Sequence, residues 1–132
     1  MILLDTHALI WVLEGTPRLG RRAARAANRA LQEDRLWTSA VAFWELSLLV
    51  ARGRLRLASN PAYFRTRVHG LGILEAPLTG DIALAAAALA GILEDPADCF
   101  MAATAAIHHG KLMTADRRLL DAAVVEVLDA ER

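Results

Sequence analysis

Residues 1–15 read MILLDTHALIWVLEG, and this stretch predicts a buried strand followed directly by a helix. The uninterrupted apolar run at residues 1–4 is typical of a strand that is covered on both faces. Apolar side chains then recur at helical spacing over residues 6–14, before Gly15, a residue that commonly ends helices. The acid Asp5 therefore lies at the junction between the first strand and the first helix.

The same alternation of strand and helix continues along the chain. Further strands are expected at residues 35–38, 73–75, 111–114 and 124–128. Further helices are expected at residues 19–31, 39–53, 60–68, 79–90, 95–109 and 116–122. Because parallel strands are joined by a helix's length of chain, this order predicts an α/β fold with a central parallel β-sheet flanked by helices on both faces. We expect a single domain over residues 1–132.

The composition is that of a globular protein. Hydrophobic residues make up 55% of the 132 residues and charged residues 23%, which excludes a disordered tail. The apolar run near the start is interrupted by Asp5 and His7 and is too short to span a bilayer. A lone cysteine, Cys99, excludes an internal disulfide and any zinc site with several cysteines. We therefore expect a soluble protein of the cytoplasm.

The net charge of zero conceals two halves of opposite sign. Residues 17–67 hold eleven arginines against three acids, a balance of +8, whereas residues 68–132 hold four basic residues against ten acids, a balance of −6. This distribution suits a polyanionic ligand held near a negatively charged centre. Arginine on exposed helices also serves solubility, and a basic surface can bind an acidic segment of a partner protein, so both alternatives stay open.

Four acids occupy positions where a carboxylate is costly without a partner. Asp5 and Asp116 follow strands, Asp98 lies in the first turn of a helix, and Glu45 lies within an apolar helix. All four can be reached from the carboxyl edge of the sheet, where ligands of such folds bind. Two unit charges 4 Å apart repel by roughly 4 kcal/mol at an effective dielectric constant near 20, so convergent carboxylates require a cation. A Mg²⁺ or Mn²⁺ ion fits oxygen ligands, and its natural chemistry is phosphodiester hydrolysis.

Each acid also has an ordinary structural explanation. Asp5 and Asp116 could cap the helices that follow them, and Asp98 could form a capping pair with Asp95. Glu45 could reach solvent at the edge of its helix. Its neighbours three and four residues away include no cation, so a buried Glu45 needs a partner from another segment.

The helix at residues 39–53 is expected to bury a stripe formed by Val41, Trp44, Leu48 and Leu49. Trp44, like Trp11 and Trp37, is expected in the core or in a dimer contact rather than stacked on nucleic-acid bases.

Four motifs, in order along nearly the whole chain, resemble those of PIN-domain proteins, specifically the VapC-type toxins of bacterial toxin–antitoxin pairs. They are ILLDTHALIW at residues 2–11, SAVAFWEL at 39–46, DPADCFMAATA at 95–105 and LMTADR at 112–117. One departure is that many relatives carry a basic residue after the third acid, where this chain has Cys99.

The resemblance places the four acids of the family on Asp5, Glu45, Asp98 and Asp116, as catalytic residues that bind Mg²⁺ or Mn²⁺ or orient water. It implies an RNA substrate cut endonucleolytically, a cognate antitoxin that blocks the site, and a homodimer. Arg117, beside Asp116, is the arginine expected to meet the scissile phosphate. Two alternatives are a non-catalytic module that binds RNA or protein, and a metal-dependent phosphohydrolase that acts on a small phosphoester.

Overall fold

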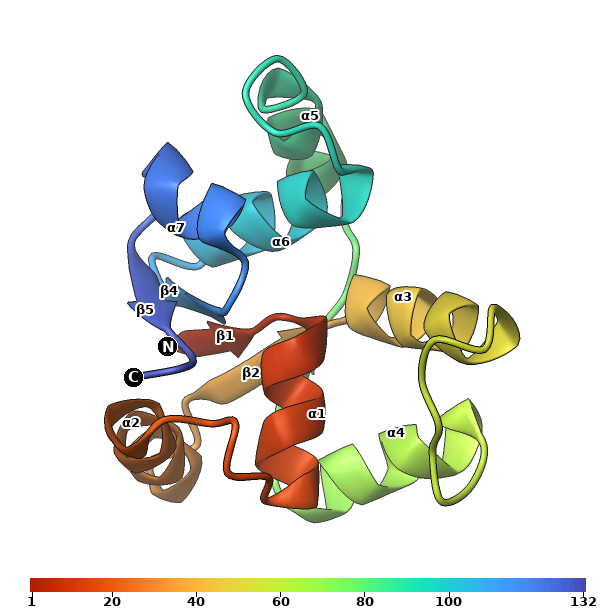
Figure 1. The fold of residues 1–132 in the computed structure, drawn as a ribbon. Coiled ribbons are helices and arrows are strands. Elements are labelled where there is room, and N and C mark those ends of the chain that lie inside the picture. The colour runs from red at the N-terminus through yellow and green to blue at the C-terminus, as the bar shows by residue number, and fades with distance from the viewer.

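Five short strands alternate with seven helices in the computed structural model, which describes residues 1–132 (Figure 1). The strands are β1 (Ile2–Leu4), β2 (Leu36–Ser39), β3 (Leu74–Ala76), β4 (Lys111–Thr114) and β5 (Val127–Asp129). The helices are α1 (Thr6–Glu14), α2 (Arg21–Gln32), α3 (Ala40–Ala51), α4 (Pro61–Gly70), α5 (Gly80–Ala88), α6 (Pro96–Ile107) and α7 (Arg117–Ala122). None of these helices is both long enough and apolar enough to cross a membrane.

All five strands are parallel and form one sheet in the order β3-β2-β1-β4-β5. The first strand is therefore central, and Leu3 is paired with Trp37 of β2 on one side and with Leu112 of β4 on the other. Helices α1, α2 and α4 lie on one face of the sheet, and α6 and α7 lie on the other, with α5 packed outside α6 (Figure 1). The predicted parallel sheet with helices on both faces is confirmed.

The central strands and α6 supply most of the core. Leu3, Leu4, Leu112 and Met113 are fully buried, as expected for parallel strands covered on both faces. Helix α6 buries seven of its twelve residues, most of them alanine, and these small side chains let it lie close to the sheet and to α5.

Polar caps fix where the helices begin. Six of the seven helices start after a residue whose side chain accepts a backbone N–H of the first turn: Asp5, Ser39, Asn60, Thr79, Asp95 and Asp116. The exception is α2, which starts after Gly20. A side chain at Gly20 would overlap the backbone of Arg132, whose carbonyl accepts the Arg22 N–H at 2.8 Å, so the glycine allows the start of α2 to lie against the end of the chain.

Two local predictions were wrong. The last strand is β5 at Val127–Asp129 rather than residues 124–128, because the chain is still turning after α7. Helix α3 buries Val41, Ala42 and Leu46, whereas Trp44, a member of the expected apolar stripe, is 58% exposed, so it is not a core residue and only the expected dimer contact stays open for it. Apolar residues occur on every side of α3, so their spacing did not identify the face that packs on the core.

Candidate active site

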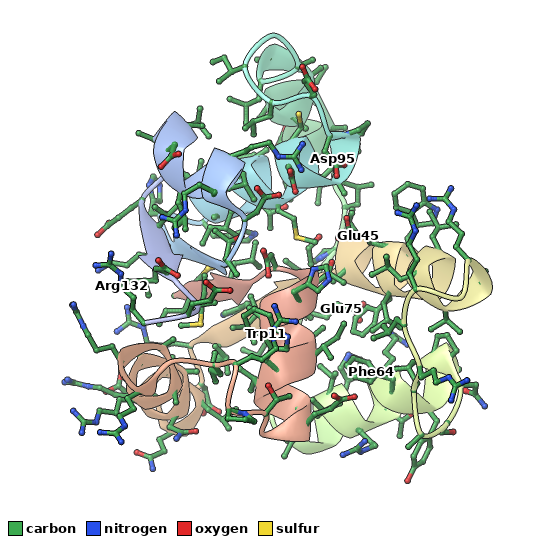
Figure 2. The ribbon with its side chains drawn as sticks, in the orientation of Figure 1. Trp11, Glu45, Phe64, Glu75, Asp95 and Arg132 are labelled. Carbon is green, nitrogen blue, oxygen red and sulfur yellow. The ribbon has the colours of Figure 1, made fainter.

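The four predicted acids come from four separate segments that meet at the carboxyl edge of the sheet. Asp5 follows β1 directly, and Asp116 follows β4 by two residues. Glu45 lies on α3, which follows β2, and Asp98 lies in the first turn of α6. Since β1 lies between β2 and β4, these segments adjoin one another. Figure 2 shows Glu45 and Asp95, from α3 and from the start of α6, on this same side of the molecule.

Asp5 is a buried carboxylate without a cationic partner. Only 9% of the residue is exposed, and its side chain caps α1 by accepting the Ala8 N–H at 2.9 Å. Burial raises the pKa of Asp5 to about 6, and hydrogen bonds from the Thr114 side chain and the Ala8 N–H, together with the charge of His7, oppose this rise only in part. The nearby negative charge of Glu45 raises the pKa further.

Asp98 is the group on which the other acids converge. Burial is the largest cause that raises the pKa of Asp98 to about 7. The negative charges that raise it further are those of Asp95, Asp116, Glu45 and Asp5. The other three predicted acids, together with Asp95, are therefore close enough to Asp98 to raise its pKa.

Glu45 is partly buried, and its partner comes from another helix. The Thr6 hydroxyl of α1 donates a hydrogen bond to Glu45 Oε1. Thr6 is 1% exposed, so this bond links the start of α1 to α3 beneath the cluster. The partner required by a carboxylate on an apolar helix is thus a neutral hydroxyl rather than a cation.

Asp116 differs from the others because it has a cationic neighbour. It caps α7 through the Arg118 N–H at 2.9 Å, and the Arg118 guanidinium Nη2 lies 3.3 Å from its Oδ2. Burial would raise the pKa of Asp116, but the hydrogen bonds and the charge of Arg118 outweigh burial and hold this pKa below its usual value. The Arg118 side chain is 70% exposed, so solvent screens this ion pair and it contributes little to stability.

The capping explanations hold for some of the acids. Asp5 and Asp116 do cap α1 and α7. Helix α6 is instead capped by Asp95, which accepts the Ala97 N–H at 2.9 Å. No hydrogen bond contributes to the pKa of Asp98, so capping does not explain why a carboxylate stands there.

The residues suit a divalent cation in charge and ligand type. As their side chains stand, no three Asp, Glu, His or Cys groups lie close enough together to hold a metal ion. The negative charges of Asp5, Glu45, Asp95 and Asp116 nevertheless act on Asp98, and Arg118 is the one cation that forms an ion pair with any of these acids. A hard divalent cation with several water ligands matches carboxylate oxygens of this kind.

Two residues of this site were not singled out from the sequence. Asp95 and Arg118 line a cavity of about 220 Å³ together with Asp98. Asp95 lies three residues before Asp98 and hence on the same helix face, which is the signal that could have identified it. Arg117, which was singled out, has its guanidinium 3.7 Å from Asp129 of β5 rather than among the carboxylates.

The comparisons with known proteins agree with the motifs. A family model for the PIN domain matches residues 2–125. Ribonuclease VapC22 from Mycobacterium tuberculosis is 34% identical over 123 residues, which cover 89% of this chain and 88% of that protein.

Solved structures share the fold. FitAcB from Neisseria gonorrhoeae is 27% identical, with a TM-score of 0.67 and 98% of each chain covered. A toxin–antitoxin complex from Klebsiella pneumoniae, at 22% identity, a TM-score of 0.62 and 98% coverage of each chain, shows the fold alone. With its parallel sheet, its four motifs and a match over nearly its whole length, this chain belongs to the PIN domain family.

Proposed function

We propose that this protein is a metal-dependent endoribonuclease that hydrolyses RNA phosphodiester bonds and acts as the toxin of a toxin–antitoxin pair. The observation that carries the proposal is the convergence of Asp5, Glu45, Asp95 and Asp116 on Asp98 at the carboxyl edge of the sheet. The relation to ribonuclease VapC22 supports RNA as the substrate.

Asp5, Glu45, Asp98 and Asp116 would hold the Mg²⁺ or Mn²⁺ ion. When bound, the ion would activate the attacking water and offset the negative charge on the departing oxygen. The chain itself orients these carboxylates: the Ala8 N–H fixes Asp5, and the Thr6 hydroxyl fixes Glu45. Asp98, with a pKa of about 7, carries a proton for part of the time at neutral pH and releases it when a cation arrives.

Two arginines at the start of α7 would meet the substrate. Arg118 lies beside Asp95 and Asp98 in the small cavity, so an RNA phosphate would compete with Asp116 for its guanidinium. Arg117, mostly exposed, extends toward β5, where a neighbouring phosphate of the same RNA could reach it. Arginine suits both contacts because its planar group binds phosphate through two N–H bonds.

The partners follow from the family and from one exposed surface. A cognate antitoxin that covers the carboxylates would keep the enzyme inactive in the cytoplasm, and a structural relative is itself a toxin–antitoxin complex. Trp44, Leu78 and Phe100 line an apolar hollow of about 320 Å³ on α3 and its neighbours. An exposed tryptophan beside such a hollow is typical of a protein interface, and we assign it to a homodimer.

One observation favours a non-catalytic alternative. The ion pair between Asp116 and Arg118 already neutralises one of the four acids, as expected if the chain kept the fold but no longer bound a metal ion. A module of that kind would bind RNA or protein without Mg²⁺-dependent turnover.

The deciding experiment is cleavage of structured RNAs with Mg²⁺, with Mn²⁺ and with EDTA. The wild-type protein and Asp121→Asn, which removes an exposed acid on α7, should cut RNA with either metal and not with EDTA. Asp98→Asn should not cut RNA under any of these conditions, because its amide cannot supply the negative charge that the ion requires. Cleavage that persists in EDTA or in Asp98→Asn would contradict the proposal. Release of phosphate from a model ester without any cut RNA would favour the small-molecule phosphohydrolase.

A further inference from the structure

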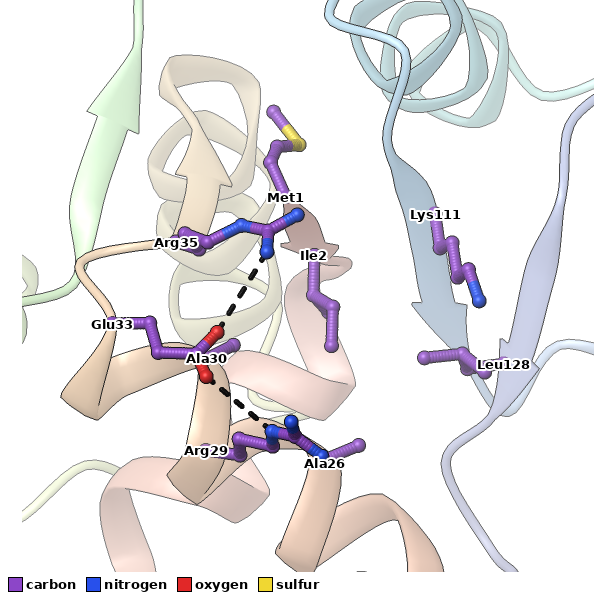
Figure 3. A pocket seen from close by; sticks show the side chains of 9 residues that line it. All are labelled: Met1, Ile2, Ala26, Arg29, Ala30, Glu33, Arg35, Lys111 and Leu128. Atoms are coloured by element: carbon purple, nitrogen blue, oxygen red, sulfur yellow. Dashed lines mark hydrogen bonds and ion pairs between the residues drawn. The ribbon is translucent and has the colours of Figure 1, made fainter.

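Two hollows adjoin each other between α2 and the β5 side of the sheet. One, of about 330 Å³, lies at the amino ends of β1 and β4 and is lined on one side by α2 (Figure 3). The other, of about 430 Å³, lies between α2 and β5 and reaches the end of the chain. Ala26 and Leu128 line both hollows, so together they form one surface, which we call the α2–β5 groove.

The α2–β5 groove is strongly basic. Its lining holds two carboxylates, Glu33 and Asp129, against six cationic side chains: Arg22, Arg25, Arg29, Arg35, Lys111 and Arg132.

The cations differ in how well they are compensated. Glu33 stands between Arg29 and Arg35, at 3.3 and 3.7 Å from their guanidinium nitrogens (Figure 3). Lys111 is paired with Glu126 at 3.1 Å. Arg22 and Arg25 are exposed and form no ion pair in the structure, so their charges are available to a ligand.

One end of the groove lies next to the start of α7. Asp129 Oδ2 is 3.7 Å from the guanidinium of Arg132, which lines the groove, and 3.7 Å from that of Arg117. Arg117 immediately follows Asp116 of the carboxylate cluster. Figure 2 shows Arg132 on the α2 side of the molecule, away from Glu45 and Asp95. Arg117, at the start of α7, and Arg132, in the α2–β5 groove, therefore share the carboxylate of Asp129.

We propose that the α2–β5 groove binds the sugar–phosphate backbone of the RNA as it leaves the carboxylate cluster. The inference rests on the proposed function for the identity of the polyanion. Cationic side chains that contact phosphates position a nucleic acid without reading its sequence. The groove contains no aromatic side chain on which a base could stack, so the contact is with the backbone.

The lining favours RNA over an acidic peptide. Apart from the cations and Asp129, the wall between α2 and β5 consists of Ala23, Ala26, Val127 and Leu128. Protein partners are anchored by large side chains in well-packed apolar pockets, which these small or partly buried residues do not form. A phosphate backbone needs only the charges.

The test measures RNA binding in EDTA, so that it does not depend on cleavage. The probe is a labelled oligouridylate, titrated at several salt concentrations with the full-length protein. Arg22→Gln with Arg25→Gln is compared with Arg54→Gln and Arg56→Gln, which remove two exposed, unpaired arginines from the loop between α3 and α4 on the other side of the molecule (Figure 1). A third protein with Arg22→Lys and Arg25→Lys retains the charges.

The variant with Arg22→Gln and Arg25→Gln should bind the oligouridylate about tenfold more weakly than the wild-type protein. The slope of its log Kd against log salt should be smaller by about 0.7 for each phosphate that the protein no longer neutralises. The Lys pair should bind nearly as the wild-type protein does, and so should the pair in the α3–α4 loop. Equal weakening by both Gln pairs would show that only total charge matters and would overturn the inference. Unchanged RNA binding by the Gln pair at 22 and 25, with loss of binding to a polyglutamate peptide, would overturn it in favour of an acidic protein partner.

The outcomes separate this inference from the proposed function. If the variant with Arg22→Gln and Arg25→Gln cuts long RNA with an unchanged KM, the inference about the groove is contradicted, whereas the proposed nuclease activity is supported. If the same variant loses RNA affinity although neither it nor the wild-type protein cuts RNA, the inference about the groove is supported and the proposed nuclease activity is contradicted.

Discussion

At the scale of single residues, the site combines carboxyl groups whose pKa values are raised by their surroundings with neutral groups that donate hydrogen bonds to carboxylates. Burial and mutual repulsion raise the pKa of Asp5 to about 6 and that of Asp98 to about 7. The partners within the chain are neutral, except for Arg118 at Asp116. Perturbed carboxylates gathered at one place are typical of functional sites rather than of stabilising networks.

The raised pKa of Asp5 predicts a dependence of stability on pH. A group whose pKa is higher in the folded than in the unfolded protein stabilises the fold below its unfolded value of 3.8, and this contribution is lost as pH rises through about 6. Asp5→Asn keeps the cap on α1 because an amide oxygen also accepts the Ala8 N–H. In EDTA at pH 8 the free energy of unfolding of the variant should therefore be about 3 kcal/mol higher than that of the wild type, with little difference at pH 4. Urea titrations at both pH values measure this, and a loss of stability at pH 8 would contradict it.

The hydrogen bond between Thr6 and Glu45 predicts a positioning role for Thr6. Thr6→Val replaces the hydroxyl by a methyl group of similar size and leaves Glu45 without its partner, which should cost about 1–3 kcal/mol of stability. RNA cleavage should fall mainly through kcat, because the orientation of a carboxylate at the reacting centre is altered. Thr6→Ser, which keeps the hydroxyl, should restore cleavage. Equal activity of the Val and Ser variants at a temperature where both are folded would show that the bond only stabilises the fold.

At the scale of helices and strands, polar caps and apolar runs account for most of what could be predicted. Asn60 before Pro61 and Asp95 before Pro96 marked helix starts correctly, because both the cap and the proline depend only on local geometry. The buried face of α3 was not predicted, since which of its apolar sides meets the sheet depends on residues distant in sequence. A capping pair of Asp98 with Asp95 was the alternative explanation from the sequence, and the cap alone could not show that Asp98 faces three other segments.

The exposed side of α3 predicts a dimer contact. Trp44→Glu places a charge on a side chain that is 58% exposed, so the stability of the monomer should change by no more than about 0.5 kcal/mol. The protein should become monomeric in sedimentation experiments, because a charge would be buried in the apolar hollow with Leu78 and Phe100. Tyr63→Glu, on α4 and 53% exposed, is the matched control and should leave the dimer intact. A dimer that survives Trp44→Glu would place the interface elsewhere.

At the scale of the whole molecule, the segregation of charge seen in the sequence becomes spatial. Asp95, Asp98 and Asp116 of the second half lie with Asp5 and Glu45 at the carboxyl edge of the sheet, whereas Arg22, Arg25 and Arg29 of α2 line the groove beside β5. The order of the motifs indicated which acids would meet. The sequence could not indicate that Arg118 rather than Arg117 would face them, because neighbouring side chains on a short helix diverge by an angle that only the packing of α7 fixes.

The excess negative charge at the carboxyl edge predicts that a divalent cation stabilises the whole protein. Mn²⁺ added to metal-free protein at pH 8 should raise its melting temperature, because an ion that binds only the folded state stabilises it by mass action. Asp98→Asn should show a smaller rise, whereas Asp121→Asn should behave as wild type does. Calorimetry at increasing Mn²⁺ concentrations measures these shifts, and equal shifts in all three proteins would exclude a site at Asp98.

The central claim is that the carboxylates act as one unit in cutting RNA, and the rates of Mg²⁺-dependent RNA cleavage by Asp5→Asn, Asp98→Asn and the double variant test it most directly. When catalytic groups act as one unit, removing any one of them removes the contribution of the whole unit to the rate. Each single substitution should therefore reduce the cleavage rate nearly to background, and the double variant should be no slower than either single variant. Cleavage that survives either substitution, or two partial losses that multiply in the double variant, would contradict a shared catalytic centre.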